Sequence, residues 1–408
     1  MTHLLVLEPE ADGHPLEWLQ HLVACLREIR PSAVVSFVVA RELFAPVVAA
    51  IDNNGGGRMR VIALEPREQA RCRHRSLIVS GFARWLVMRR YLRRTGADAG
   101  HFMGLDHLSL PLALGLGAHG RRLSGILFRP SVHYAEISAY RPRWRERLRD
   151  ARKAALYRLM LRNPALARVL SLDPYFPAYA ARRYRGGAKV AALPDPVCPV
   201  TPGGRVAAAT QAAAPSNRLH LLMFGALTAR KGVMQLLDAL ERLDDGIAAR
   251  LAVVVAGRVE PALAELFKAA TERLRRRRAL QFHAEQRWLS RDEIAALLGW
   301  SDAVLAPYQR FVGSSGVMLW AAAAGKPLVT QDFGLLGRLV ADHRLGLAVD
   351  SADPGRLAAA IASLVERGTA DCFDAGRAAA FAAERTPRRF AAEILAVHGI
   401  GADATVST

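Results

Sequence analysis

The chain has 408 residues, 51% of them hydrophobic, which is enough to bury the cores of two domains. Its formal net charge is +19, carried mostly by arginine, so nucleic acid, an anionic membrane surface and a phosphorylated substrate are candidate partners. The arginines are dispersed through many predicted helices and form no Lys-rich tail or aromatic-spaced RNA motif, so nucleic acid is not favoured as a partner.

The first half of the chain alternates between strand and helix patterns. The apolar runs that we predict as strands are residues 3–7, 33–39, 60–64, 125–128, 169–172 and 189–193. Helical patterns cover residues 16–30, 76–94 and 147–162. This alternation predicts an open, mostly parallel sheet with helices on both faces, in which ligands bind at the carboxyl ends of the strands.

The composition changes after residue 193. Residues 193–204 are rich in Pro and Gly, and residues 206–216 are mostly small, which is typical of a linker. The alternation then restarts, with strands at 219–224, 251–256, 280–282, 303–306, 327–330 and 347–349 and helices at 233–243 and 261–277. We therefore predict an α/β protein with two Rossmann-like doubly wound domains at residues 1–200 and 217–385. The linker is residues 201–216, and residues 386–408 form a C-terminal helix that crosses back, followed by a tail.

The cysteines and apolar runs indicate the compartment. Cys25, Cys72, Cys198 and Cys372 lie far apart and form no Cys-x-x-Cys pair, so we expect neither a metal site nor a disulfide framework. The N-terminus lacks the basic segment and long apolar core of a signal peptide, and no apolar run reaches the roughly 18–20 residues of a membrane span. We expect a cytoplasmic protein, either soluble or peripheral at the inner face of a membrane.

Residues 311–329 are the most informative stretch, because a loop of small residues precedes a helical run, a tight turn and a buried strand. The loop residues are Gly313, Ser314, Ser315 and Gly316. Such a loop directs backbone N–H groups, the positive end of the helix dipole and two hydroxyls to one spot, which suits a diphosphate. The alternative is a Ser/Gly helix cap that binds no ligand.

A second loop of this kind follows the strand at 219–224. Gly225 permits a close approach of the backbone, while Arg230 and Lys231 place two cations beside a helix start. A solvated basic turn is the alternative for this pair. Two such loops in one doubly wound domain open at the same sheet edge, which favours a diphosphate site whose charge is neutralised without a metal.

These segments resemble the GT-B glycosyltransferases, most closely the family 4 group of sugar-nucleotide-dependent enzymes. The matching segments are the turn at 225–232, the strand end at 256–257, and residues 301–308, 324–329 and 346–350, in the family's order and spacing. The first half matches only in layout. The resemblance implies two Rossmann-like domains that face a cleft and transfer a sugar from a nucleotide-diphosphate donor to an acceptor hydroxyl. It also implies retention of configuration, no metal and no cofactor other than the donor.

The resemblance assigns the donor to the second domain. The donor-binding residues would be Gly225, Arg230, Lys231, Gly257 and His283, together with the four residues of the 313–316 loop. The acceptor would be a glycan, a lipid-linked molecule or a small molecule.

The sequence departs from the family at two carboxylates. Family 4 enzymes usually carry two Glu eight residues apart, one at the donor sugar and one at the ribose, and the matching positions here are Val312 and Trp320. Neither side chain accepts hydrogen bonds as a carboxylate does. Trp320 packs either against the ribose or base or into the core. His283 follows a predicted buried strand, at the place where relatives hold the nucleobase, with an ordinary surface residue as the alternative.

The first domain offers candidates for the acceptor side. Gly13 and His14 follow the first strand, and Asp106, Arg129 and His133 follow other strand-like runs. A His or Asp there can position or deprotonate an acceptor hydroxyl, and the alternative for each is a surface or capping residue. Family members place a His from this domain near the donor sugar, which makes His133 the first catalytic candidate and Asp106 the second.

The helical pattern at 76–94 combines apolar residues with five arginines. Such a basic amphipathic helix either docks on anionic lipid or packs against the core with its arginines in solvent.

Two other functions fit the same residues. A sugar-nucleotide epimerase of the GT-B fold would consume the donor without an acceptor. A non-catalytic nucleotide-sugar-binding protein would bind the donor tightly without hydrolysing it.

Overall fold

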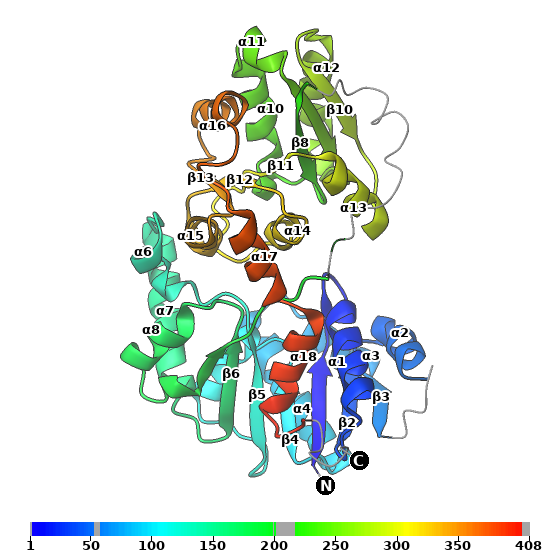
Figure 1. The fold of residues 1–408 in the computed structure, drawn as a ribbon. Helices are drawn as coiled ribbons and strands as arrows, with labels where there is room; N and C mark the ends of the chain where they lie inside the picture. Colours follow the sequence, from blue (N-terminus) through cyan, green and yellow to red (C-terminus); the bar gives the residue numbers. More distant parts are fainter. Residues whose placement is uncertain (1, 53–57, 199, 201–216, 402–408) are drawn as a thin grey trace. The chain divides into compact units, whose positions relative to one another are not determined.

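The computed structural model describes residues 2–52, 58–198, 200 and 217–401 (Figure 1). The predicted linker at 201–216 lies outside the described residues. The chain divides into two compact units. The N-terminal unit comprises residues 1–133, 142–196 and 385–408, and the C-terminal unit comprises residues 134–141 and 197–384. A short segment from the first half of the chain, Tyr134–Arg141, is therefore part of the C-terminal unit, which the sequence did not predict.

The N-terminal unit is built on a seven-stranded sheet whose paired strands are all parallel. Its order is β3-β2-β1-β4-β5-β6-β7. The strands are β1 (His3–Glu8), β2 (Val34–Val39), β3 (Met59–Ala63), β4 (Ala99–Phe102), β5 (Arg122–Leu127), β6 (Leu166–Ser171) and β7 (Val190–Ala192). The predicted strands therefore form one sheet, to which the structure adds β4 at its centre.

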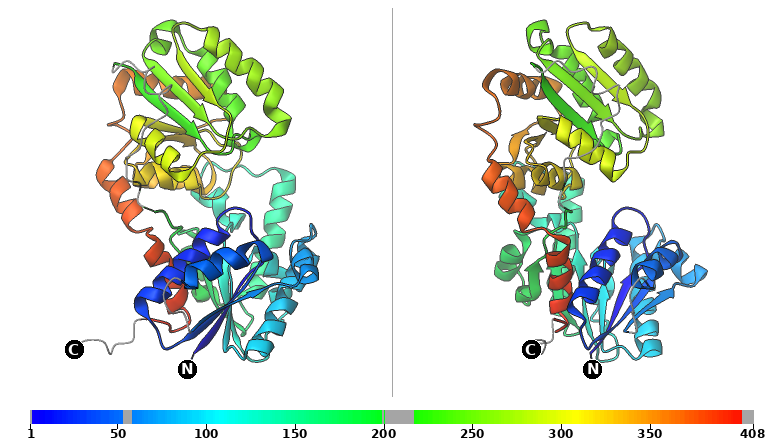
Figure 2. Two further views of the ribbon diagram at one scale, coloured as in Figure 1. Left: turned by 90° about the vertical axis from the view of Figure 1, so that its right-hand side faces the viewer. Right: turned by 45° about the vertical axis from the view of Figure 1, so that its right-hand side comes forward.

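Helices cover both faces of this sheet (Figure 2). They are α1 (Pro15–Ile29), α2 (Arg41–Asp52), α3 (Pro66–Cys72), α4 (Leu77–Thr95), α5 (Ser109–Ala113), α7 (Trp144–Met160), α8 (Phe176–Arg183) and α18 (Pro387–Ala396). Three short 3-10 turns are η1 (Asp106–Leu108), η2 (Ser131–His133) and η3 (Gly187–Lys189). One buried cluster joins α4, α5, α7 and α8 to one face, and another joins α1, α2 and α18 to the other face. The C-terminal helix α18 packs along α1.

The C-terminal unit has a six-stranded parallel sheet of order β10-β9-β8-β11-β12-β13. The strands are β8 (Leu219–Phe224), β9 (Leu251–Ala256), β10 (Gln281–Glu285), β11 (Ala303–Ala306), β12 (Leu328–Gln331) and β13 (Gly346–Val349). All six residues of β9 are buried, as expected for a central strand covered on both faces.

The helices of the C-terminal unit alternate with its strands. They are α6 (Tyr134–Ile137), α10 (Val233–Arg242), α11 (Asp245–Ala248), α12 (Ala264–Arg276), α13 (Arg291–Trp300), α14 (Gly316–Ala323), α15 (Gly334–His343), α16 (Pro354–Arg367) and α17 (Ala375–Ala383). Two 3-10 turns are η4 (Ala229–Lys231) and η5 (Pro261–Leu263). The alternation of these elements confirms the predicted doubly wound fold.

The strand order locates the binding edge of the C-terminal sheet. The chain runs from β8 outward to β10 and then returns to place β11 on the other side of β8. Ligands in such sheets bind beyond the carboxyl ends of the strands where the order reverses. The loops after β8 and β11 flank this point, and both predicted phosphate loops are here.

No helix among the described residues is both long enough and apolar enough to span a bilayer.

Candidate functional site

The loop after β8 is a tight turn that brings Lys231 back to the strand end. The hydroxyl of Thr228 accepts a hydrogen bond from the Lys231 backbone N–H at 3.3 Å, which starts η4. Gly232 ends η4 with a φ of 73°, and a Cβ there would lie 1.8 Å from the carbonyl oxygen of Pro307. A glycine is therefore required at 232, where the β8 and β11 loops touch.

Gly225 and Gly257 bring the carboxyl ends of β8 and β9 into backbone contact. Gly257 has a φ of 151°, and a Cβ on it would lie 1.9 Å from the carbonyl oxygen of Gly225. Gly225 has a φ of 90°, and a Cβ on it would lie 2.9 Å from Nζ of Lys231. Gly257 thus lets the end of β9 approach Gly225, and Gly225 lets the backbone approach the Lys231 ammonium, as the sequence suggested for Gly225.

The two cations of this turn have aromatic and carbonyl neighbours. Nζ of Lys231 donates to the carbonyl of Phe224 at 3.2 Å, and the Arg230 guanidinium lies 4.8 Å from the Phe311 ring centre. Burial, and then the charge of Arg230, lowers the pKa of Lys231 to about 8. Within the described residues, no carboxylate forms an ion pair with either cation. Two adjacent positive charges without an acidic partner favour binding of an anion.

The loop before α14 lies next to these cations. The Ser315 hydroxyl is buried and lies 2.7 Å from the hydroxyl of Tyr308, so it does not cap the amides of α14. The Tyr308 ring stacks on Phe311 with 4.8 Å between ring centres. Gly313 is buried, whereas Ser314 and Gly316 are half-buried. The start of α14, which we predicted as an anion site, thus follows a loop that Tyr308, just after β11, holds in place through Ser315 and Phe311.

Side chains from three neighbouring loops hold this edge of the sheet together. Gln309 donates to the Ser351 carbonyl at 2.9 Å, and the Ser351 hydroxyl donates to the Tyr308 carbonyl at 2.6 Å. Gln331, at the end of β12, accepts from the Phe311 N–H at 3.1 Å and donates back to the Phe311 carbonyl. These bonds fix the positions of the loops after β11, β12 and β13 relative to one another.

A pocket of about 220 Å³ opens beside these loops in the C-terminal unit. Its lining residues come from the Tyr134–Arg141 segment and from the loops after β11, β12 and β13: Ala139, Arg141, Tyr308, Arg310, Gln331, Asp332, Phe333, Asp350, Ser351 and Ala352. The pocket contains two arginines and two aspartates. Burial, and then the charge of Asp350, raises the pKa of Asp332. Such a lining can donate and accept hydrogen bonds.

The positions where family 4 enzymes carry glutamates have other surroundings here. Val312 contributes backbone contacts: its carbonyl accepts from the Leu335 N–H at 3.4 Å. Trp320 is half-buried, with its ring 6.5 Å from Phe224 and under the Arg291 guanidinium at 5.6 Å. The Trp320 ring therefore lies against the end of β8 rather than wholly within the core.

His283 lies in the edge strand β10 and is half-buried. The next residue but one in the strand, Glu285, accepts the Gly257 N–H through its backbone at 2.8 Å, which links β10 to the glycine pair. The role of His283 at the nucleobase stays a prediction.

His133 is the first of the catalytic candidates in the N-terminal unit. It ends η2, and its Nε2 lies 2.8 Å from Oδ2 of Asp173. The ring packs on Tyr179 at 5.1 Å, and only 1% of the residue is exposed. The sequence could not indicate this burial, because Asp173 lies forty residues further along the chain. A catalytic role for His133 stays a prediction.

Asp106 holds the loop that follows β5. Its carboxylate accepts the backbone N–H of Phe128 at 3.0 Å and that of Arg129 at 3.4 Å. The Arg129 side chain is exposed, and its carbonyl accepts from Lys153 at 3.2 Å. Asp106 therefore fills the capping role that was the alternative to catalysis, and its catalytic role stays a prediction.

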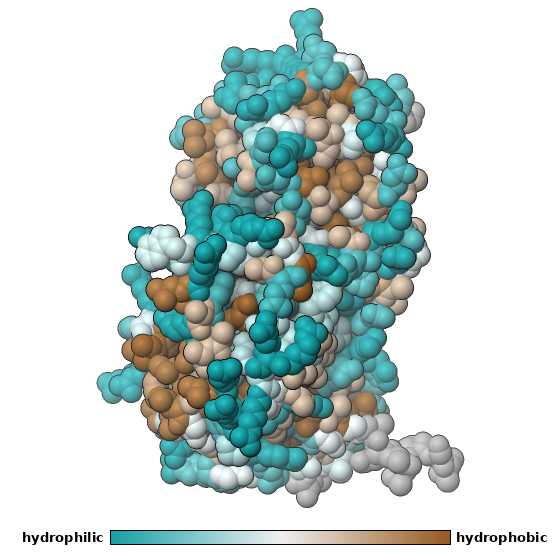
Figure 3. All heavy atoms as spheres, turned by 90° about the vertical axis from the view of Figure 1, so that its left-hand side faces the viewer, coloured by the Kyte–Doolittle hydropathy of each residue, from teal (hydrophilic) through white to brown (hydrophobic). Residues whose placement is uncertain are grey.

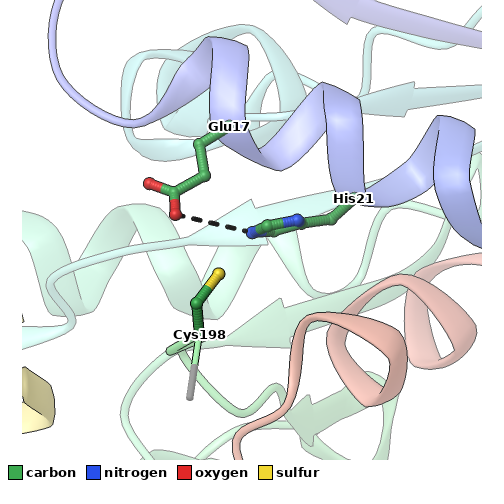
Figure 4. A group of neighbouring side chains, drawn as sticks. All are labelled: Glu17, His21 and Cys198. Carbon is green, nitrogen blue, oxygen red and sulfur yellow. Dashed lines mark ion pairs between the residues drawn. The ribbon is translucent and has the colours of Figure 1, made fainter. Parts of the chain in front are cut away.

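Gly13 and His14 form the loop between β1 and α1. Gly13 has a φ of 91°, and His14 is exposed, with its Nδ1 3.7 Å from Glu17. A hydrogen bond to Glu17 raises the pKa of His14. Glu17 also forms an ion pair with His21, one turn later on α1, at 3.8 Å (Figure 4). Glu17 thus belongs to a His-carboxylate-His cluster at the start of α1.

Glu8 is a titratable residue that the sequence reasoning missed. It is the last residue of β1, is buried, and accepts the Glu10 N–H at 2.8 Å. Burial raises the pKa of Glu8 to about 7, near the value that suits a general acid or base. The available signal was a carboxylate at the carboxyl end of a strand, the edge where ligands bind in open sheets.

Comparisons with known proteins agree with the fold described above. Residues 218–367 match the family described as Glycosyl transferases group 1. A sucrose-phosphate synthase from Thermosynechococcus elongatus is similar in structure, with a TM-score of 0.67 and 15% identity over 98% of each chain. The HepE protein of Anabaena in complex with UDP has a TM-score of 0.65 and 16% identity, covering 97% of this chain and 100% of its own. A glycosyltransferase from Rickettsia africae has a TM-score of 0.66 and 12% identity over 97% of each chain. No curated protein matches the sequence.

Proposed function

We propose that this chain, a GT-B glycosyltransferase whose residues 218–367 belong to the group 1 glycosyl transferases, moves a sugar from a nucleotide-diphosphate donor to an acceptor hydroxyl. The diphosphate binds the C-terminal unit between the loops after β8 and β11. Arg230, Lys231 and the start of α14 stabilise the negative charge that develops on the leaving diphosphate.

The observation that carries this proposal is the half-buried ammonium of Lys231, whose pKa is lowered to about 8 by burial and then by the charge of Arg230. Removing a lysine charge from water costs free energy, which a carboxylate partner usually offsets. Here the ammonium contacts a backbone carbonyl and lies beside the positive charge of Arg230. Among the described residues, neither cation forms an ion pair with a carboxylate. A bound diphosphate would supply the missing negative charge.

The uncapped start of α14 supports the same position for the ligand. The Ser315 hydroxyl bonds Tyr308 and leaves the first amides of α14 to other partners. Arg230 lies against Phe311 at the start of the same loop, so its guanidinium and the helix amides can bind one anion together.

The neighbouring pocket offers a replacement for the missing glutamate pair. We place the donor sugar there, with Asp332 and Asp350 accepting hydrogen bonds from sugar hydroxyls. Tyr308 lines this pocket and also braces the phosphate loop, which supports a continuous site for diphosphate and sugar. Changing Asp332 to Asn should raise the KM for the donor and leave the affinity for the free nucleotide diphosphate unchanged. An equal loss of both affinities would contradict this assignment.

A direct test starts from the free nucleotides. The HepE structure contains UDP, so UDP, GDP and ADP are the first probes in a thermal-shift panel with the full-length protein. The best base is then tested as its sugar nucleotides, followed by analysis of the product with candidate glycan, lipid-linked and small-molecule acceptors.

The matched variants are Arg230→Ala and Arg276→Ala. Arg276 is exposed at the end of α12, away from the β8 and β11 loops. Removing one charge-assisted hydrogen bond should weaken diphosphate binding about 10–100-fold in the first variant and leave the second unchanged. Equal affinities in both variants would refute the proposed site.

We further propose that the reaction needs no metal and retains the anomeric configuration. The two cations next to the proposed diphosphate supply the charge neutralisation that a metal gives in other enzymes. Turnover should therefore persist in EDTA, and NMR of the first-formed product should show the configuration of the donor. Donor consumption without an acceptor would instead indicate an epimerase, and binding without consumption a non-catalytic protein.

A further inference from the structure

Helix α7 of the N-terminal unit exposes an apolar stripe to solvent. Trp144 is 69% exposed, Leu148 66% and Leu159 47%, and Ala151 and Ala155 are exposed between them. The spacings of four, three, four and four residues place all five on one face of the helix. The opposite face provides Tyr157 and Met160 to the core. We call the five exposed residues the α7 stripe.

Basic residues border the α7 stripe on both sides. Helix α7 contains six basic and two acidic residues, and its five arginines are all exposed: Arg145, Arg147, Arg149, Arg152 and Arg158. Both acidic residues are half-buried and engaged: Glu146 accepts the Arg143 N–H at 2.7 Å, and Asp150 accepts the Ser131 hydroxyl at 2.8 Å. The exposed surface of the helix is therefore apolar at its centre and positive at its edges.

Exposed apolar side chains also occur on neighbouring elements of the N-terminal unit. Helix α5 contacts both α4 and α7, and Leu114, directly after α5, is exposed. The exposed apolar side chains of α4 are Leu77, Ile78, Val79 and Leu86. The exposed arginines of α4, Arg90, Arg93 and Arg94, lie in its second half. Figure 3 shows hydrophobic side chains gathered beside hydrophilic ones on one face of the molecule.

The charge distribution selects among the partners of such a surface. A helix with an apolar stripe flanked by Arg, and with Trp at one end, has the composition of helices that lie in the interface of an anionic bilayer. The Arg145 guanidinium lies 5.1 Å from the Trp144 ring, so the cation and the ring can both sit at the level of the headgroups. A second copy of this positive surface would repel the first.

We propose that the α7 stripe binds the surface of an anionic membrane. Apolar side chains enter the headgroup boundary, and the bordering arginines contact lipid phosphates. The surface belongs entirely to the N-terminal unit, so this proposal does not depend on the proposed donor site.

The test is sedimentation of the full-length protein with vesicles of neutral phosphatidylcholine, or of phosphatidylcholine with about 30% phosphatidylglycerol. We expect binding to the anionic vesicles alone, weaker at high salt because screening reduces the attraction of exposed charges. Leu148→Ser should lower the fraction bound several-fold. Leu266→Ser on α12 is the matched control, because Leu266 is 61% exposed on the C-terminal unit.

A charge variant separates the two contributions. Replacing Arg145, Arg149 and Arg152 by Gln should remove the preference for anionic over neutral vesicles, with circular dichroism confirming that the fold is retained. The proposal is overturned if the wild-type protein does not sediment with anionic vesicles, or if Leu148→Ser binds them as the control does. A wild-type dimer that does not bind vesicles, and that Leu148→Ser converts to a monomer in light scattering, would show that the α7 stripe is a dimer interface and would also overturn the proposal.

Discussion

Replacing Lys231 by methionine should stabilise the free protein and abolish diphosphate binding. Burial and the neighbouring Arg230 lower the pKa of Lys231 from 10.5 to about 8. Between these two pH values the unfolded chain binds a proton that the folded chain lacks, so the free energy of unfolding rises with pH. Below pH 8 the ammonium is charged in both states, and the folded state bears the full cost of burying it.

The magnitude follows from this pKa difference. The gap between 10.5 and about 8 corresponds to about 3 kcal/mol, which we reduce to about 2 kcal/mol because the side chain is only half-buried. Methionine preserves the apolar stem but loses the hydrogen bond to the Phe224 carbonyl, at a cost of about 1 kcal/mol. We therefore expect Lys231→Met to raise the free energy of unfolding by about 1 kcal/mol at pH 7, or the Tm by about 2–4 °C.

Calorimetry and UDP titration of the same samples measure both effects. The gain in Tm should shrink as the pH approaches 10, where the folded wild-type lysine is already neutral. The control is Lys268→Met on the exposed side of α12, which should change neither stability nor UDP affinity. A fall in the free energy of unfolding of more than about 1 kcal/mol, or UDP affinity equal to the wild type, would refute the electrostatic argument.

Three further variants test packing within each unit. Gly257→Ala should lower the free energy of unfolding, measured in urea, by several kcal/mol, because the φ of Gly257 is 151° and a Cβ there would lie 1.9 Å from a carbonyl oxygen. The control Gly376→Ala, near the start of α17, should be almost neutral, and equal losses in the two variants would contradict this packing argument. Ser315→Ala should cost about 1–3 kcal/mol by leaving the buried Tyr308 hydroxyl unpaired, and a double variant with Tyr308→Phe should recover part of this loss. Burial lowers the pKa of His398 to about 4, so its contribution to stability should be complete above pH 6.5 and decline as the pH falls toward 4; His398→Gln should flatten that part of the Tm profile.

Local patterns in the sequence were sufficient to predict most of the sheet. β9 is a continuous run of apolar residues, and its burial on both faces follows from that run. The central strand β4 was missed because Ala99-Gly100-His101-Phe102 has little intrinsic preference for a strand. Its position comes from packing: a Cβ on Gly100 would lie 2.6 Å from the sulfur of Met88, so α4 packs closely over this point of the strand.

The candidate site was predictable where its chemistry is local. The turn from Gly225 to Lys231 has its glycine and cations within seven residues, so their proximity could be read directly. The bonds from Gln331 to Phe311 and from Ser351 to Tyr308 could not be read, because they join loops 20 and 43 residues apart. The segment 134–141, which lines part of the pocket, is still further away in the chain.

Residues close together in the chain were enough to predict that strands and helices alternate, that two glycine-containing loops follow strands of the second half, and that cations lie beside one of them. What each side chain faces depends on contacts between distant segments, so it could be seen only in the folded structure. The periodicity of α7 indicates an apolar face but not its direction, and the structure turns that face to solvent because Tyr157 and Met160 already occupy the core side. In the same way, His133 became a buried partner of Asp173 through a contact that forms only when distant segments pack together, and Lys231 became a half-buried cation.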